Sequence, residues 1–156
     1  MSATLRIIDA NRNRALEALR VLEDLARFSV GDSTLSEGFK ATRHAIVQAV
    51  ASLDATLLLT SRDAQGDVGT TIAGAVEHDR PDLHALALAN GSRATEALRS
   101  LEEALKLHDP LAATRIERVR YRTYDLARDL ALRLAGSAPR QWSVCVLLTE
   151  SICSMP

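Results

Sequence analysis

The chain has 156 residues, of which 47% are apolar and 25% charged, and these values indicate one folded domain rather than a disordered segment. Its formal net charge of −1 argues against a protein that binds nucleic acid or a membrane surface through a broad basic face. No apolar run is long enough to span a membrane, no signal peptide is evident, and two cysteines make no disulfide framework, so a cytoplasmic location is expected.

Helical periodicity extends over most of the chain. We expect a first helix at about 5–29, a second at 34–53 that begins with a capping box at 34–37, and a short helix or helix extension at 54–60. A polar break follows at 61–71. Helix resumes near residue 82 and continues to about 108. The last helix is expected to begin with Asp109 as N-cap and Pro110 at the first helical position, and to end near residue 135.

The first helix contains a segment that recurs later in the chain. Residues 10–28 match residues 89–107 at an offset of 79, with ten of the nineteen positions identical and five of those ten polar or charged. Residues 40–44 resemble residues 117–121 at an offset of 77. Helix packing requires only apolar residues at the right spacing, so the repeated polar residues indicate an internal duplication. We predict an all-α bundle of two helical hairpins related by a pseudo-twofold axis, with a C-terminal extended tail.

The composition changes after the last helix. We divide the chain into a helical domain at 1–135, a linker at 136–141 and an apolar segment at 142–156 that is typical of a buried β-strand. A single strand after a helical domain has no sheet to join. The segment is therefore interpreted as the truncated beginning of a following domain.

Asn11 and Asn90 hold equivalent places in the repeat, inside the apolar stripe of their helices. A buried carboxamide is costly without hydrogen-bond partners. The two side chains are therefore expected either to pair with each other as a register device or to bind a ligand. An amide offers a donor and an acceptor together, which suits an amino-substituted heteroaromatic ring.

Arg14 and Arg93 lie one turn further on, at the edge of the apolar stripe, and Glu17 and Glu96 follow them. A guanidinium at this edge can hold a phosphate with two hydrogen bonds. It can equally pair with the glutamate three residues later, which stabilises a helix only slightly. The sequence leaves both interpretations open.

The remaining charges of the repeat lie opposite or beside the apolar stripe, at spacings of three and four residues. A solvated salt-bridge face is the favoured interpretation, and an inter-helix network is the alternative. These residues are Arg20, Glu23, Arg27, Arg99, Glu102 and Lys106.

The polar break at 61–71 is the best functional candidate by position. Its glycines allow the backbone to approach a ligand, Arg62 can meet a phosphate, and Asp63 and Asp67 can hold Mg²⁺. Ordinary turn chemistry accounts for the same composition. The chain has no P-loop, dinucleotide-binding glycine motif or zinc-protease motif.

The long polar motif at residues 6–28 resembles the small helical hydroxymethylpyrimidine phosphate kinase, a domain often fused ahead of thiamine phosphate synthase. The resemblance covers roughly residues 5–130, with supporting motifs at 40–44, 62–69, 90–103 and 120–124. The segment at 142–150 resembles the first strand of the synthase barrel. Ala104 departs from the family pattern, in which an aromatic residue follows the paired acids.

The resemblance implies a role in thiamine biosynthesis, in which the γ-phosphoryl group of ATP is transferred to 4-amino-5-hydroxymethyl-2-methylpyrimidine phosphate with Mg²⁺ present. Such a transfer depends mainly on positioning and charge neutralisation. We expect a catalytic role for Arg14 and Arg93, Mg²⁺ binding by Asp63 and Asp67, and substrate binding by a third group of side chains. That third group is Asn11, Asn90, Glu17, Glu96 and Arg62.

The implied partners are the pyrimidine phosphate, ATP and a C-terminal thiamine phosphate synthase domain. The alternative is a non-catalytic domain of such a synthase, which serves in docking, in dimerisation or as a substrate carrier. The sequence leaves open which hairpin carries the site, whether there are one or two clefts, and whether the protein is a homodimer.

Overall fold

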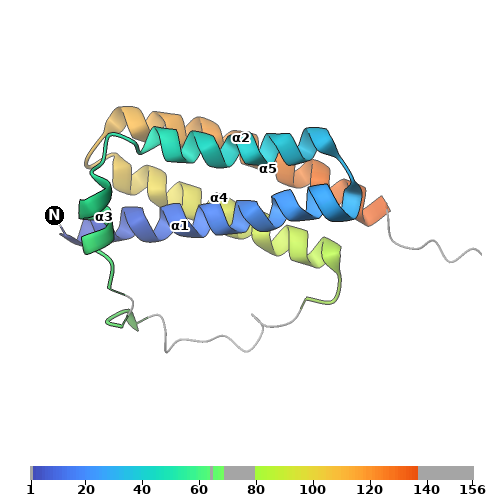
Figure 1. Cartoon of the computed structure of the whole chain (residues 1–156), viewed down its shortest axis with the longest axis horizontal. Helices are drawn as coiled ribbons and strands as arrows, with labels where there is room; N and C mark the ends of the chain where they lie inside the picture. The colour runs from blue at the N-terminus through green and yellow to red at the C-terminus, as the bar shows by residue number, and fades with distance from the viewer. Residues whose placement is uncertain (1, 64, 69–79, 137–156) are drawn as a thin grey trace, which may run out of the picture.

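The computed structural model describes residues 2–63, 65–68 and 80–136, and this part of the chain is mostly helical (Figure 1). It contains no strand, so the all-α prediction is confirmed for the described ranges. The short helix α3 stands beside one end of four long helices. The elements are α1 (Ser2–Asp24), continued by a π-helical segment (Leu25–Val30), α2 (Ser33–Ala49), α3 (Ala55–Thr60), α4 (Leu83–Leu105) and α5 (Pro110–Gly136).

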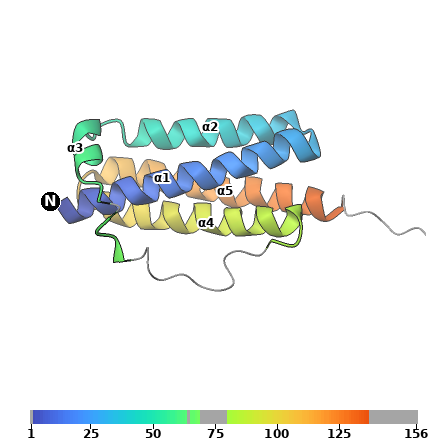
Figure 2. The same ribbon diagram turned by 60° about the horizontal axis from the view of Figure 1, so that its bottom comes forward.

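The four long helices form a bundle of two hairpins, as predicted. The first hairpin is α1 with α2 and the second is α4 with α5. α1 also packs on α4, and α2 on α5, so the helices follow one another around the bundle in the order α1, α2, α5, α4. Figure 2 shows α1 between α2 and α4. The two helices that carry the repeated segment therefore lie side by side, and they run in opposite directions (Figure 1).

The repeated apolar positions supply the centre of the core. Leu19 and Leu22 of α1 are fully buried, and so are their counterparts Leu98 and Leu101 of α4. Burial of one such leucine contributes about 1.5–3 kcal/mol through removal of apolar surface from water. The apolar half of the repeat thus explains why the two hairpins associate.

The turn between α1 and α2 differs from the predicted capping box. The π-helical segment is capped at its C-terminal end by Gly31, whose φ of 70° is left-handed and costs a glycine little. The next residue, Asp32, is extended, and its Oδ1 accepts a hydrogen bond of 2.9 Å from the backbone N of Leu35. The predicted box at 34–37 is therefore wrong, because the chain already enters the helix at residue 33.

The N-cap of α5 is the predicted one. Asp109 Oδ1 accepts hydrogen bonds from the backbone N of Leu111 and of Ala112, each 3.0 Å long. Asp109 stands 77 residues after Asp32. This is the same offset that relates residues 40–44 to residues 117–121. The same device thus begins the second helix of each hairpin.

Of the other predicted helix boundaries, the end of α2 differs from the structure and the end of α5 agrees with it closely. α2 ends at Ala49, short of residue 53, and α3 is a separate helix whose N-cap, Asp54, accepts a 2.7 Å hydrogen bond from Thr56 N. α5 ends at Gly136, close to the predicted end. The strand predicted at 142–156, and the linker after residue 136, lie outside the described residues. Within the described ranges, no helix combines the length and apolarity needed to cross a membrane.

Candidate functional site

Among the outer charges of the repeat, the two glutamates each pair with an arginine on the other helix of their hairpin. Arg20, Arg99 and Lys106 are exposed and pair with these glutamates along their own helix, as a salt-bridge ladder predicts. Glu23 Oε2 accepts a hydrogen bond of 2.8 Å from Nε of Arg43, which lies on α2. Its counterpart Glu102 accepts one of 3.0 Å from Nε of Arg120 on α5. Both carboxylates are buried. The favoured interpretation of these glutamates as part of a solvated face is therefore wrong, and the alternative holds.

The pair in the second hairpin is the more enclosed. Arg120 is buried, and its guanidinium carbon lies 4.7 Å from the ring centre of Tyr121 and 5.9 Å from that of Tyr124. Burial alone lowers the pKa of Arg120, but hydrogen bonding to Tyr124 and Glu102 outweighs it and raises the pKa. Because these charges satisfy each other, we assign the network a structural role.

The two repeated asparagines bond to their own helices. Nδ2 of Asn11 donates to the carbonyl of Ile7 and Nδ2 of Asn90 to that of Leu86, each at 2.9 Å. Among the hydrogen bonds of the described residues, none joins the two side chains. Direct pairing across the pseudo-twofold is therefore not how these amides are satisfied, and ligand binding by them stays a prediction.

The arginines and glutamates at the edge of the apolar stripe lie at the protein surface. Arg14, Glu17, Arg93 and Glu96 are all exposed. In the described ranges neither arginine forms an ion pair with the glutamate three residues later, and Nη1 of Arg93 reaches only Oδ1 of Asn90 at 3.4 Å. The helix-stabilising alternative for these residues is thus wrong. The charge of Arg14 remains available to a ligand.

A polar pocket of about 290 Å³ brings five of the predicted site residues together. α1 contributes Arg14 and Glu17, and the chain after α3 contributes Arg62, Asp63 and Asp67. Asn11, Asn90, Arg93 and Glu96 do not line it. The described residues that line this polar pocket are Arg6, Asp9, Ala10, Asn13, Arg14, Glu17, Arg62, Asp63 and Asp67.

Arg6 holds the chain after α3 against α1. Its Nη2 donates a 2.6 Å hydrogen bond to the carbonyl of Asp63, and its Nη1 lies 3.5 Å from Asp63 Oδ2. Asp63 Oδ1 in turn accepts a 2.8 Å bond from Gly66 N. Arg6 is not marked by the repeat, because its counterpart in the second copy is Ala85.

The second tie between these segments is the ion pair of Asp9 and Arg62. Nε of Arg62 donates to Asp9 Oδ2 at 2.9 Å and Nη2 donates to Oδ1 at 3.0 Å. Asp9 is only 4% exposed, whereas Arg62 is half-exposed. Hydrogen bonding to Asp9 and its charge raise the pKa of Arg62. The signal for Asp9 was present in the sequence, because its counterpart in the second repeat is the apolar Leu88.

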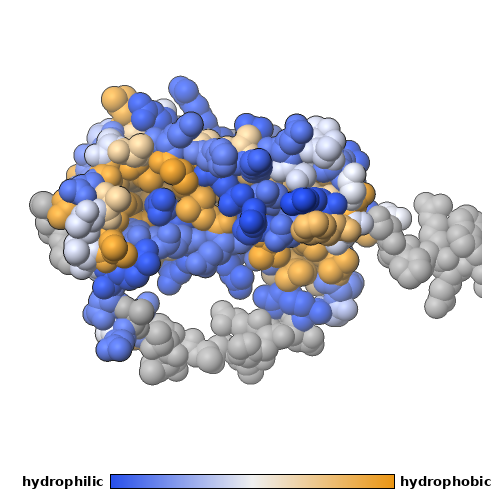
Figure 3. All heavy atoms as spheres, viewed as in Figure 1, coloured by the Kyte–Doolittle hydropathy of each residue, from blue (hydrophilic) through white to orange (hydrophobic). Residues whose placement is uncertain are grey.

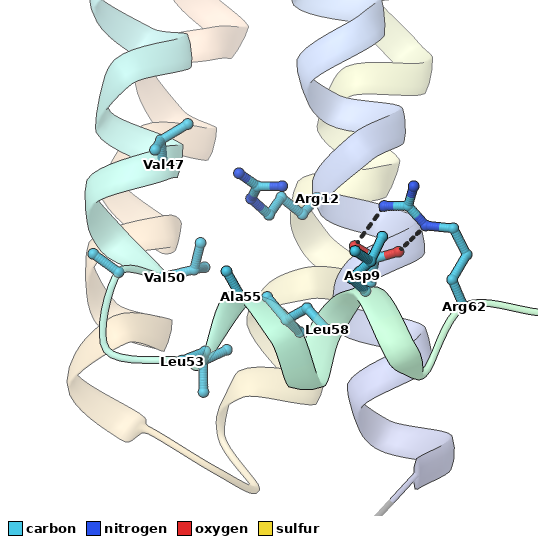
Figure 4. Close-up of a pocket in the computed structure, with 10 residues that line it drawn as sticks. Asp9, Arg12, Val47, Val50, Leu53, Ala55, Leu58 and Arg62 are labelled. Atoms are coloured by element: carbon cyan, nitrogen blue, oxygen red, sulfur yellow. Dashed lines mark hydrogen bonds and ion pairs between the residues drawn. The ribbon is translucent and has the colours of Figure 1, made fainter.

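A second hollow, the apolar cavity, lies on the other side of this ion pair. It measures about 400 Å³ and opens between α1, α2 and α3 (Figure 4). Figure 3 shows apolar residues gathered in a band on this face of the bundle. The lining consists of Asp9, Arg12, Val47, Val50, Ala51, Leu53, Ala55, Leu58, Leu59 and Arg62, so Asp9 and Arg62 belong to both hollows.

Metal binding at the polar pocket would depend on a ligand as well as on the protein. In the described part of the chain no three His, Cys, Asp or Glu side chains are grouped closely enough to hold a metal ion. Asp63 and Asp67 do line one pocket. Mg²⁺ is commonly held by one or two carboxylates together with substrate phosphates. The two aspartates fit that mode, and their role stays a prediction.

Comparison with known proteins places the chain in a family. A model of the ThiD2 family matches residues 6–129, which include most of both hairpins and the segment between them. The chain belongs to the ThiD2 family. No solved structure matches it.

The ThiD2-family chain also resembles curated proteins named thiamine-phosphate synthase. It is 45% identical over 132 residues to one from Rhodopirellula baltica, covering 85% of this chain and 35% of the relative. It is 43% identical over 129 residues to one from Synechocystis, covering 83% of this chain and 36% of the relative. The chain thus spans about a third of the length of these relatives.

Proposed function

We propose that this domain serves thiamine biosynthesis as an ATP-dependent kinase of 4-amino-5-hydroxymethyl-2-methylpyrimidine phosphate. The ThiD2 family and the relatives named thiamine-phosphate synthase support the pathway. The polar pocket carries the proposal, because it gathers on one face of α1 the arginines and carboxylates that the repeat and the polar break contribute separately.

The proposed reaction joins two phosphates. An oxygen of the pyrimidine monophosphate forms a bond to the γ-phosphorus of ATP as the bond from that phosphorus to the β,γ-bridging oxygen breaks, and ADP leaves. A phosphate monoester has a second pKa of about 6, so the attacking oxygen is already ionised at neutral pH. The reaction therefore requires no protein nucleophile and no strong base.

The work left for the protein is to position the two phosphates and offset their charge. Arg14 meets this need, because its guanidinium lines the polar pocket and forms no ion pair among the described residues. Arg62 is held in place by Asp9 through Nε and Nη2, which leaves Nη1 for a phosphate oxygen. Mg²⁺, when bound, would neutralise nucleotide phosphate charge, with Asp63 and Asp67 as its protein ligands.

The proposal assigns the chemistry to the first repeat. Arg93 and Glu96 stand at the equivalent positions of α4, but they line neither the polar pocket nor the apolar cavity. Asn90 is likewise outside both. Arg14 is therefore proposed as the catalytic arginine.

The test is to incubate the 156-residue protein with ATP, Mg²⁺ and the pyrimidine monophosphate, and to follow the products by ³¹P NMR. The expected result is pyrimidine diphosphate and ADP in equal amounts, with no diphosphate when ATP is omitted. Tight binding of the monophosphate without turnover would replace the kinase with a carrier domain. Absence of both binding and turnover would favour a docking domain.

A further inference from the structure

The two hairpins differ in how closely their helices approach each other, α1 and α2 in the first hairpin and α4 and α5 in the second. Arg12 of α1 corresponds to Gly91 of α4 at the offset of 79, and Val50 after α2 corresponds to Ala127 of α5 at the offset of 77. A Cβ atom on Gly91 would lie 3.2 Å from Cβ of Ala127, which is tight contact. The second hairpin is therefore closed at this level. α4 also packs on α5 more extensively than α1 packs on α2.

The first hairpin is open at the same level. Arg12 and Val50 line the apolar cavity, and Leu58 of α3 borders it at the end of the bundle (Figure 4). Its volume of about 400 Å³ lies in the range of small-molecule sites. Because two copies are identical when a duplication occurs, the cavity is a place where one hairpin has since diverged from the other.

Of the two arginines in the described lining of this cavity, Arg12 has no carboxylate partner, whereas Arg62 is bound to Asp9. The guanidinium of Arg12 extends from α1 towards α2 (Figure 4). Among the described residues it has no ion pair, its Nε is buried without a hydrogen-bond partner, and its Nη1 reaches only Oδ1 of Asn13 at 3.4 Å. The acid in the described lining, Asp9, is already bound by Arg62. A buried donor without an acceptor is costly, which points to an anionic ligand.

We infer that the apolar cavity binds the monophosphate substrate, an aromatic ring that carries one phosphate. The ring packs on Val47, Val50 and Leu58, and the phosphate accepts hydrogen bonds from Arg12. This assignment rests on the proposed function and adds to it a separate compartment for each substrate. The polar pocket then holds the nucleotide phosphates.

The two compartments meet at the ion pair of Asp9 and Arg62, which lines both. The guanidinium of Arg62 is fixed there by two hydrogen bonds, and its third nitrogen is left for an oxygen of either phosphate. Such a fixed cation between two anions reduces their repulsion as they approach. The second repeat has Leu88 in place of Asp9 and Gly91 in place of Arg12, so it offers no equivalent arrangement.

The first experiment measures equilibrium binding of the pyrimidine monophosphate by calorimetry, with no ATP present. Arg12→Gln is expected to weaken it about ten-fold or more, because a hydrogen-bonded charge pair is lost, while ATP binding measured separately changes little. Arg118→Gln serves as the matched control, since Arg118 lines a different hollow on α5. Unchanged monophosphate affinity in Arg12→Gln, or an equal loss of ATP affinity, would overturn the assignment.

A second ligand separates the phosphate from the ring. The non-phosphorylated pyrimidine alcohol is expected to bind the unaltered protein more weakly than the monophosphate does, and Arg12→Gln is expected to remove most of that difference. Val50→Phe, which fills the cavity, is expected to weaken both pyrimidines and spare ATP, in protein whose helical circular dichroism is unchanged. Retention of pyrimidine binding in folded Val50→Phe would place the ligand elsewhere.

These binding measurements are independent of turnover. Arg12-dependent binding of the monophosphate without any diphosphate formation would support the cavity and refute the kinase. Diphosphate formation that is insensitive to both Arg12→Gln and Val50→Phe would support the kinase and refute the cavity.

Discussion

Arg62 binds the buried carboxylate of Asp9 with two hydrogen bonds across 53 residues of sequence. This pair fixes the chain after α3 against α1. It also forms the boundary between the polar pocket and the apolar cavity. In the proposed site, phosphate binding therefore depends on the orientation of Arg62 as well as on its charge.

Asp9→Asn should therefore impair the reaction without removing the cation. We expect kcat/KM to fall about ten-fold or more, as for other residues that position a transition-state donor. Arg62→Gln should cause a similar fall, and the double variant should be little worse than either single one. Additive losses in the steady-state rates would contradict a shared role.

The ion pair of Glu102 and Arg120 should contribute to stability rather than to turnover. Glu102→Leu leaves Arg120 buried without its carboxylate, and the free energy of unfolding should fall by about 3 kcal/mol. Adding Arg120→Met should recover most of this loss. Glu23→Leu is the matched comparison and should cost less, because its partner Arg43 is more exposed. Urea titrations that show equal losses for both single variants would refute the difference in enclosure.

The close contact of α4 and α5 makes Gly91 sensitive to substitution. Gly91→Val should lower the free energy of unfolding by about 1–3 kcal/mol, because the added carbons overlap Ala127. Ala127→Gly should relieve part of this cost in the double variant. Thermal unfolding that shows no loss in Gly91→Val would mean that the second hairpin is not closed at this level.

The N-cap Asp109 should account for part of the loss of folding stability at low pH. Hydrogen bonds from Ala112 N and from Ser52 lower the pKa of Asp109 below its ordinary value of 3.8. The ionised cap therefore stabilises the folded state above that value, and its contribution is lost as the pH falls through the lower folded pKa. Asp109→Asn keeps a capping oxygen but does not titrate. Urea titrations below pH 4 should show a shallower decline in the variant, and parallel curves would exclude this contribution.

The long helices followed from the sequence because their signals are local. Apolar spacing and the dipeptide of Asp109 and Pro110 predicted elements that the structure contains. The cap of α2 was missed because Asp32 and the residues at 34–37 offer competing caps, and the backbone after Gly31 decides between them. The burial of Glu23 and Glu102 was assigned wrongly because helical spacing fits a solvated ladder and an inter-helix pair equally well.

The site was harder to predict because it depends on residues that break the repeat. Comparison of identical positions selected Asn11, Arg14 and Glu17, whereas Asp9 and Arg12 stand opposite a leucine and a glycine in the second copy. An emphasis on shared residues passes over such positions. Their joint placement also requires the return of the chain through α3, which no local pattern encodes.

The most direct test compares the equivalent arginines of the two repeats. Arg14→Gln and Arg93→Gln remove the same group from exposed helix positions, so their structural costs should be similar. The rate of pyrimidine diphosphate formation is the measurement. We predict that kcat/KM falls about 100-fold in Arg14→Gln and much less in Arg93→Gln. A comparable fall in both variants, or a larger one in Arg93→Gln, would contradict a site on the first repeat.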